Sequence, residues 1–253
     1  MAILEANEVS INFGGVKAVV DLSLTVDEGQ ILGIIGPNGS GKTTFFNILT
    51  GIYRPTSGTF VFKGEDITGW PAHRVTQHGI ARTFQNIRLF GNMTVLDNVL
   101  VGGHAHIGAS LWHVLLHNQN RDEAEKRLKE EAYELLCFMG LEHRVDEFAA
   151  NLPYGVQRRL ELARALASEP SILLLDEPTA GMNDTEARYI MEHIRRIQEM
   201  GVTVLLIEHN MRVMMGTAEW IVALDAGRKI AEGVPREIQR DEKVIKAYLG
   251  EEE

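Results

Sequence analysis

Residues 31–43, ILGIIGPNGSGKT, join a short apolar run to a glycine-rich loop that ends in lysine and threonine. The loop fits the pattern G-x-x-x-x-G-K-[ST], in which successive backbone N–H groups surround nucleotide phosphates at the start of a helix. The run Ile31 to Ile35 is typical of a buried strand, and Thr44 to Leu49 is helix-like, so the motif has the context that it requires. The stretch therefore predicts an α/β fold with a phosphate-binding loop.

Every residue of the loop is a candidate ligand. The glycines let the N–H groups turn toward the phosphates, Lys42 neutralises β/γ charge, and Thr43 can ligate magnesium. The predicted nucleotide-binding residues are Gly36, Pro37, Asn38, Gly39, Ser40, Gly41, Lys42, Thr43 and Thr44. By itself the loop predicts binding of either ATP or GTP.

Two further apolar runs, Ile172 to Leu175 and Val202 to Ile207, are typical of buried parallel strands. Residues 22–27 and 58–64 instead mix β-forming residues between turn residues, which predicts a small, largely antiparallel sheet. Strand signals fade from about residue 86, and Arg121 to Met139 has apolar residues at helical spacing. The middle third is therefore predicted to be helical.

Carboxylates follow the second apolar run directly. Asp176 and Glu177 are expected at the ligand edge of the sheet, Asp176 to hold magnesium directly or through water, and Glu177 to act as general base on the attacking water. His209, two residues beyond the third run, comes to the same edge and could sense the terminal phosphate. Gln85, after the strand-like residues 80–84, could ligate the metal and orient water.

Composition excludes several classes of protein. The 253 residues carry a formal net charge of -10 with no long basic cluster, which argues against a nucleic-acid binder. The apolar runs are far shorter than the roughly 20 residues that span a bilayer, so any membrane role is expected to be peripheral. The N-terminus lacks a secretory signal, which predicts that the chain stays where it is made. Cys137, the single cysteine, lies among apolar neighbours and is predicted to be a core residue.

Taken in order, the loop, Gln85, residues 152–159 (LPYGVQRR), residues 176–179 (DEPT) and His209 resemble the ATPase subunit of an ABC transporter over essentially the whole chain. The resemblance implies a P-loop NTPase (RecA-like) core with an N-terminal antiparallel β subdomain and an inserted α-helical subdomain. It implies one nucleotide-binding domain over residues 1–253, with the helical subdomain at about 86–167 and a C-terminal extension at about 234–253. ATP and Mg²⁺ are the expected cofactors.

The resemblance also assigns roles. Gln85 falls in the Q-loop, residues 152–156 in the signature motif, Asp176 in Walker B, Glu177 at the catalytic base, residues 180–183 in the D-loop and His209 in the H-loop switch. Phe13 stands where the family has an aromatic residue that stacks on adenine, with a core phenylalanine as the alternative. Pro153, Tyr154 and Gly155 would contact ATP held by the opposite subunit of a dimer.

Within the family, some stretches are similar to the LivG type, which energises branched-chain amino-acid uptake; they include residues 82–85 (RTFQ), the Tyr-Gly signature, and residues 247–250 (AYLG). The type implies a LivF-like partner ATPase, or a homodimer, on two membrane permeases at the cytoplasmic side of the membrane. A periplasmic or extracellular solute-binding protein would feed the permeases. Urea and amide importers use close relatives, so they stand as the alternative for the solute.

Pro153 occupies the place where the family signature usually has a serine, and Val156 stands where glutamine is common. Loss of a hydrogen bond to a charged group costs on the order of 1.5 to 3 kcal/mol. In a heterodimer, the ATP site that uses this chain's signature is therefore expected to be the weaker of the two. Proline is tolerated near a helix start, so the helix that follows should form.

Two other classes of protein fit the sequence less well. A P-loop kinase or small GTPase does not explain the signature stretch, and the GTPase motif N-K-x-D is absent. A non-transport ABC protein, acting as a binding or remodelling module in translation or DNA repair, usually carries two ATPase domains, a long coiled-coil insertion or zinc cysteines. This chain is predicted to have one domain, and it has one cysteine.

Overall fold

The computed structural model describes residues 1–103 and 119–249. Its strands are β1 (Ala2–Phe13), β2 (Val16–Asp27), β3 (Ile31–Ile35), β4 (Ser57–Phe62), β5 (Glu65–Asp66), β6 (Ile80–Arg82), β7 (Ile172–Asp176), β8 (Thr203–Ile207), β9 (Trp220–Asp225) and β10 (Arg228–Gly233). Its α-helices are α1 (Lys42–Leu49), α2 (Ala72–Gln77), α3 (Val95–Gly103), α5 (Gln119–Phe138), α6 (Tyr154–Leu166), α7 (Asp184–Glu199), α8 (Met211–Thr217), α9 (Pro235–Ile238) and α10 (Glu242–Leu249), with 3₁₀ helices at Glu142–Arg144 and Ala149–Asn151.

The central sheet has the strand order β10-β9-β3-β8-β7-β6, in which β9, β3, β8, β7 and β6 are parallel and β10 is antiparallel to β9. Every residue of β3, β7 and β8 is buried, because helices or the second sheet cover both faces. The three predicted buried parallel strands are confirmed. Since they are neighbours, the segments that follow their C-terminal ends meet at one edge.

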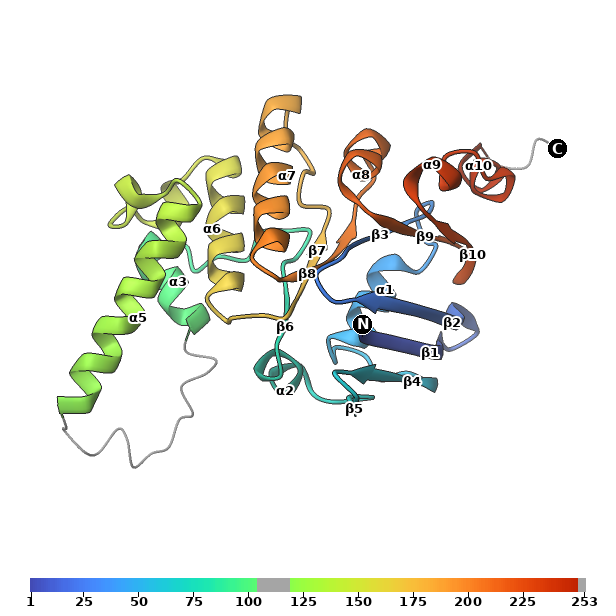
Figure 1. Cartoon of the computed structure of the whole chain (residues 1–253), viewed down its shortest axis with the longest axis horizontal. Helices are drawn as coiled ribbons and strands as arrows, with labels where there is room; N and C mark the ends of the chain where they lie inside the picture. The colour runs from blue at the N-terminus through green and yellow to red at the C-terminus, as the bar shows by residue number, and fades with distance from the viewer. Residues whose placement is uncertain (104–118, 250–253) are drawn as a thin grey trace.

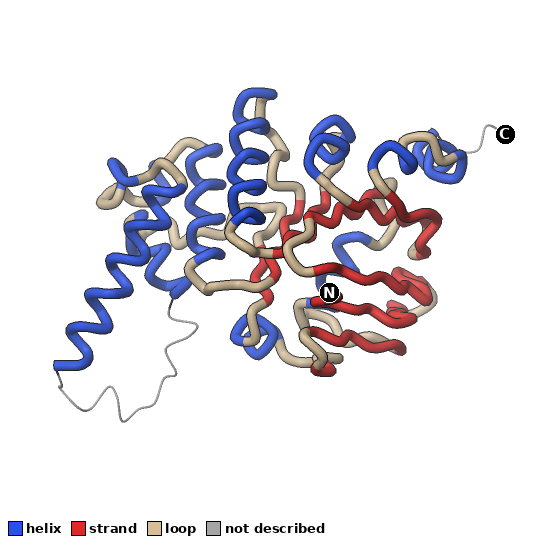
Figure 2. Tube along the Cα trace, viewed as in Figure 1, coloured by secondary structure: helices blue, strands red, loops and turns tan. Residues whose placement is uncertain are grey.

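A second, antiparallel sheet has the order β2-β1-β4-β5. Figure 2 shows strands of this sheet in red near the N-terminus. Its buried side chains, such as Leu4 and Phe60, share one apolar cluster with Phe45 of α1 and Leu174 of β7. Helix α1 is therefore packed into the core between the two sheets, which fixes the loop that precedes it. The predicted antiparallel sheet is confirmed.

Helices α3, α5 and α6 occur between β6 and β7 along the chain and pack on one another. They lie at the end of the molecule away from the N-terminal sheet, with α7 between α6 and the rest of the core (Figure 1). The helix predicted over residues 121–139 is α5. The predicted helical subdomain (86–167) and C-terminal extension (234–253) include residues 104–118 and 250–253, which lie outside the described residues. Of the described helices, none is long and apolar enough to cross a bilayer.

The prediction that Cys137 is a core residue is wrong, because the side chain is exposed. The buried positions near it are Ala132, Leu136 and Met139. These positions follow the 3.6-residue period of a helix, and Cys137 lies about 100° around the helix from Leu136. Apolar neighbours in sequence therefore do not put Cys137 on the buried face.

Candidate functional site

Residues 36–41 form a tight loop between β3 and α1 whose glycines are required by geometry. Gly36, Gly39 and Gly41 have φ angles of 150°, 82° and 101°, which residues with a Cβ rarely adopt. A Cβ on Gly36 would lie 2.1 Å from the Leu224 carbonyl oxygen, and one on Gly41 would lie 2.5 Å from that of Ala18. The loop thus lies against the ends of its neighbouring strands.

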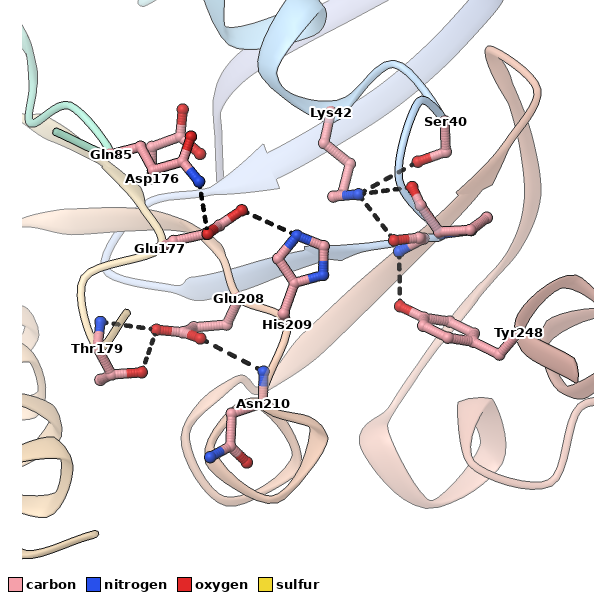
Figure 3. A network of polar contacts seen from close by, with 12 residues as sticks. Ser40, Lys42, Gln85, Asp176, Glu177, Thr179, Glu208, His209, Asn210 and Tyr248 are labelled. Carbon is pink, nitrogen blue, oxygen red and sulfur yellow. Dashed lines mark hydrogen bonds and ion pairs between the residues drawn. The ribbon is translucent and has the colours of Figure 1, made fainter. Parts of the chain in front are cut away.

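The Lys42 side chain is buried beneath this loop. Its Nζ donates to the carbonyl oxygens of Gly36 at 2.7 Å and Pro37 at 2.9 Å, and contacts Ser40 Oγ at 3.4 Å (Figure 3). Burial lowers the pKa of Lys42, while Glu177 and Asp176 oppose that shift. Asn38, Gly39 and Thr43 are exposed, unlike the Lys42 side chain, so this part of the motif faces solvent.

The three predicted catalytic side chains meet at the end of β7. Glu177 Oε2 accepts a hydrogen bond of 2.9 Å from Gln85 Nε2, and Oε1 lies 2.8 Å from His209 Nε2 (Figure 3). Glu177 has a φ of 49°, in the left-handed region, and its N–H donates to the Ile207 carbonyl at 2.9 Å. Such conformations are disfavoured outside glycine and are concentrated at functional sites. The carboxylate is therefore held between an amide and an imidazole from two other segments.

Asp176, the last residue of β7, is buried beside Arg82. Arg82 Nη2 donates to Asp176 Oδ2 at 3.0 Å, and the side chains are 6% and 2% exposed. Burial raises the pKa of Asp176, and Arg82 counteracts this rise. The second carboxylate oxygen, Oδ1, is buried and makes no hydrogen bond within the described part of the chain. A buried carboxylate oxygen with no hydrogen-bond partner has a lone pair available for a cation, so Asp176 fits a metal role.

The other predicted metal ligands supply oxygen as well. Thr43 is exposed at the start of α1, and the hydrogen bond from Gln85 Nε2 to Glu177 leaves the amide oxygen as the ligand atom. Within residues 1–103 and 119–249 no three His, Cys, Asp or Glu side chains are grouped to hold a metal ion. A small number of protein ligands, all of them oxygen atoms, suits Mg²⁺, because water and substrate phosphates usually complete its coordination.

Sequence reasoning missed two charged residues at this edge. Arg82 also donates to Asn47 Oδ1 at 2.7 Å, so it joins β6 to α1. Glu208, buried between Ile207 and His209, accepts from the Thr179 N–H at 2.9 Å and from the Thr179 hydroxyl at 2.5 Å (Figure 3). The available signal for Glu208 was a carboxylate directly after a buried strand, the same signal that identified Asp176.

The signature residues are not near the loop of their own chain. Pro153 precedes α6, which begins at Tyr154, and the predicted survival of this helix is confirmed. Helix α6 and helix α1 lie on opposite sides of α7 (Figure 1). No side chain caps the start of α6, and Pro153 and Tyr154 are exposed. The helix N-terminus therefore presents amides and a favourable dipole for an anion outside this chain.

Residues 180–183 lie beside that helix start. A Cβ on Gly181 would be 3.9 Å from Tyr154 Cε1. Asn183 is the N-cap of α7: its Oδ1 accepts from the Thr185 and Glu186 N–H groups, and its own N–H donates to Glu186 Oε2. The exposed Tyr154 of the predicted signature and the exposed Gly181 of the predicted D-loop are therefore neighbours at the start of α6.

Hydrogen bonds from the buried Arg158 join the signature helix to the main chain at Gln85. Arg158 of α6 is fully buried and donates to the carbonyl oxygens of Phe84 at 2.8 Å and Gln85 at 2.9 Å. Its charge is matched by Glu161 Oε2 at 2.7 Å. Burial raises the pKa of Glu161, and Arg158 opposes the rise. The main chain next to Gln85 is thus held by α6, a link that sequence reasoning missed.

Phe13, at the end of β1, is 44% exposed and packs edge-to-face on Tyr53 with ring centroids 5.1 Å apart. The alternative that Phe13 is a core residue is therefore wrong. Tyr53 follows α1, and its N–H donates to the Asn47 carbonyl at 3.1 Å. An exposed aromatic face beside the end of α1 is compatible with stacking on a base.

Comparison with protein families gives two matches. The model described as ABC transporter matches residues 19–180, and the model described as branched-chain amino acid ATP-binding cassette transporter matches residues 228–253. The chain is 43% identical over 250 residues to the high-affinity branched-chain amino acid transport ATP-binding protein BraF of Pseudomonas aeruginosa, covering 98% of each chain. It is 41% identical, with the same coverage, to LivG of Salmonella typhimurium. The lipopolysaccharide export system ATP-binding protein LptB of Haemophilus influenzae is 35% identical over 252 residues, covering 100% of this chain and 99% of LptB.

Solved structures agree. A nucleotide-free ATP-binding cassette from an ABC transporter superposes with a TM-score of 0.86 at 32% identity, covering 99% of this chain and all of the other. A dimeric post-hydrolysis cassette bound to ADP and Pi has a TM-score of 0.76 at 26% identity, covering 92% of this chain and 99% of the other. The predicted fold class is therefore confirmed.

Proposed function

The chain belongs to the ABC transporter family, among the ATP-binding proteins of its branched-chain amino-acid branch, and from this premise we propose that it hydrolyses ATP to power uptake of branched-chain amino acids. The observation that carries the hydrolytic part is the Glu177 carboxylate, held 2.9 Å from Gln85 Nε2 and 2.8 Å from His209 Nε2. The solute rests on the relatives and on the C-terminal match.

Nucleotide binding uses the loop and α1. Backbone N–H groups of residues 38–44 and the N-terminal dipole of α1 receive the phosphates, and Lys42 exchanges its bonds to the Gly36 and Pro37 carbonyls for bonds to the β- and γ-phosphates. Phe13 stacks on the adenine. Thr43, Asp176 and Gln85 would hold Mg²⁺, which neutralises phosphate charge when bound.

Hydrolysis then requires a base and an oriented water. Glu177 accepts a proton from the water while the water oxygen forms a bond to the γ-phosphorus. The bond between the γ-phosphorus and the β,γ-bridging oxygen breaks, and the products are ADP and inorganic phosphate. The Gln85 amide orients the water and the carboxylate from one side. His209 bonds the other carboxylate oxygen and senses the terminal phosphate.

A second subunit completes each site. Pro153, Tyr154 and Gly155 contact the ATP that the partner subunit binds. This partner is a LivF-like ATPase or a second copy of this chain. The two ATPase subunits work on two membrane permeases at the cytoplasmic side of the membrane, fed by a solute-binding protein. The helical subdomain, at about residues 86–167, passes the opening and closing of the dimer to the permeases.

Replacement of Lys42 by methionine is expected to weaken ATP binding about 10- to 100-fold, because charge-assisted bonds to phosphate are each worth about 1.5 to 3 kcal/mol. Equilibrium dialysis with labelled ATP measures the change. The exposed Lys63, whose Nζ bonds Ser171 Oγ, supplies the matched control Lys63→Met, which should bind ATP like the wild type. Equal affinities for the wild type and Lys42→Met would contradict the assignment.

The solute is tested by reconstituting the chain with its permeases, partner ATPase and solute-binding protein in vesicles. ATP-dependent uptake of labelled leucine, isoleucine or valine is expected. Uptake of urea or a short amide instead would favour the alternative importer. Co-purification with nucleic acid, and with no permease, would favour a non-transport ABC protein.

A further inference from the structure

The C-terminal helix α10 is attached to the core by contacts of its own. Val244 of α10 and Ile238 of α9 are buried in the main apolar cluster. Asp241 Oδ1 accepts from the N–H groups of Lys243 at 2.8 Å and Val244 at 3.2 Å, which caps the helix start. Figure 1 shows α9 and α10 beside β9 and β10, at the end of the molecule opposite α5. Packing of Val244 and capping by Asp241 therefore hold α10 against the core.

This attachment brings Tyr248 to the phosphate-binding loop. The Gly36 N–H donates to the Tyr248 hydroxyl oxygen at 2.8 Å, although the two residues are 212 positions apart (Figure 3). Tyr248 is 39% exposed, and partial burial raises the pKa of its hydroxyl, while the bond from the Gly36 N–H opposes that rise. Nothing in the proposed reaction uses this tyrosine.

Gly36 is the residue through which Tyr248 would act. Its N–H is bound by Tyr248 and its carbonyl by Lys42 Nζ at 2.7 Å, so both of its peptide units are restrained. On the strand side, the Leu224 carbonyl leaves no room for a Cβ. In the proposed exchange Lys42 leaves the Gly36 carbonyl for the phosphates, whereas the Tyr248 bond uses the Gly36 N–H and does not depend on Lys42. The tyrosine can thus keep the loop in place during that exchange.

We infer that Tyr248 is a positioning residue for the phosphate-binding loop, through which the docked helix α10 preorganises Gly36 and raises the affinity for nucleotide. The inference rests on the proposed nucleotide binding and adds a part for the C-terminal segment. A loop held in its binding conformation loses less conformational freedom when it binds, so the gain is in binding free energy. An effect of this kind acts equally on the ground state and the transition state.

The test is Tyr248→Phe in the full chain, which removes one hydroxyl and keeps the ring. Titration calorimetry with MgADP is expected to give about 3- to 10-fold weaker binding, as expected for one lost hydrogen bond. In the assembled transporter, KM for ATP should rise by a similar factor while kcat changes less than twofold. Without nucleotide, Tm should fall by no more than a few degrees.

Tyr133→Phe, an exposed tyrosine on α5, is the matched control and should leave both MgADP affinity and KM unchanged. Wild-type affinity in Tyr248→Phe would overturn the inference, as would a fall in kcat without a rise in KM, or a loss of Tm large enough to account for the weaker binding. Failure of the wild type itself to bind MgADP would instead overturn the proposed function.

Discussion

Steady-state ATP hydrolysis by dimers of this chain alone is expected to fall about 10²- to 10⁴-fold when Glu177 is replaced by glutamine, because both sites then lack the general base, and a positioned general base contributes that much to the rate. Glutamine keeps the size of the side chain and can still bond Gln85 and His209, but it cannot take a proton from water. ATP affinity should stay within about threefold of the wild type, because the loop and Lys42 are unchanged. Phosphate release and equilibrium ATP binding measure the two quantities separately.

The control for this prediction is Glu192→Gln, which removes an exposed carboxylate from α7. It should hydrolyse ATP like the wild type. Hydrolysis by Glu177→Gln within threefold of the wild type would exclude Glu177 as the base. A parallel loss of ATP binding would show that the substitution damages the loop instead.

The same variant tests the asymmetry that Pro153 predicts. In a heterodimer, Glu177→Gln disables the site that uses the partner's signature, and the matching change in the partner disables the site that uses Pro153, Tyr154 and Gly155. Single-turnover hydrolysis should therefore fall more for Glu177→Gln than for the partner's variant. Equal losses would contradict the idea that the Pro153 site is weaker.

Replacement of Arg158 by methionine should lower the free energy of unfolding by about 3 to 5 kcal/mol, because it leaves the Glu161 carboxylate buried without its counter-ion. It also removes the donors from the Phe84 and Gln85 carbonyls. Urea denaturation followed by circular dichroism measures the loss. The adjacent Arg159→Met is the control: Arg159 is only partly buried and donates to the Met139 and Gly140 carbonyls, so its loss should be smaller.

A second substitution and a change of pH separate charge from packing. Arg158→Met with Glu161→Met should recover most of the stability, since an apolar pair can replace a buried ion pair. Without Arg158 the pKa of Glu161 in the folded protein rises further above its ordinary 4.5. Folding of the Arg158→Met variant then takes up a proton, so its free energy of unfolding falls as the pH rises from 4.5 toward that raised pKa. The loss caused by Arg158→Met should therefore be smaller at pH 5 than at pH 7.5. A loss equal at both values would contradict the charge explanation.

Much of the fold could be predicted because β3, β7 and β8 are buried on both faces and appear in the sequence as unbroken apolar runs. The parallel arrangement then brings the loop, Glu177 and His209 to one edge without further information. The prediction for Cys137 failed because an apolar neighbourhood in sequence does not specify which side of a helix is buried.

The partners of charged and polar residues could not be predicted in the same way. Asp176 pairs with Arg82 from 94 positions away, and Gly36 bonds Tyr248 from 212 positions away. Such pairs depend on which elements become neighbours, which no local pattern specifies. Glu161 and Glu208 did carry a signal, a carboxylate within or next to an apolar segment, but only the tertiary structure shows what neutralises or binds them.

The parallel pairing of the central strands also has a consequence for how the subunit folds. Gln85 and Glu177 are 92 positions apart, and β3 pairs with β8 through Ile31 and Val204. Contacts between residues so distant in sequence require the closure of long loops. The entropy of loop closure is lost before the contacts contribute stabilising energy, so this sheet forms late and slowly. Glu177 meets Gln85 and His209 only when β6, β7 and β8 lie in their final places. A partly folded subunit therefore lacks the arrangement of side chains on which the proposed hydrolysis depends.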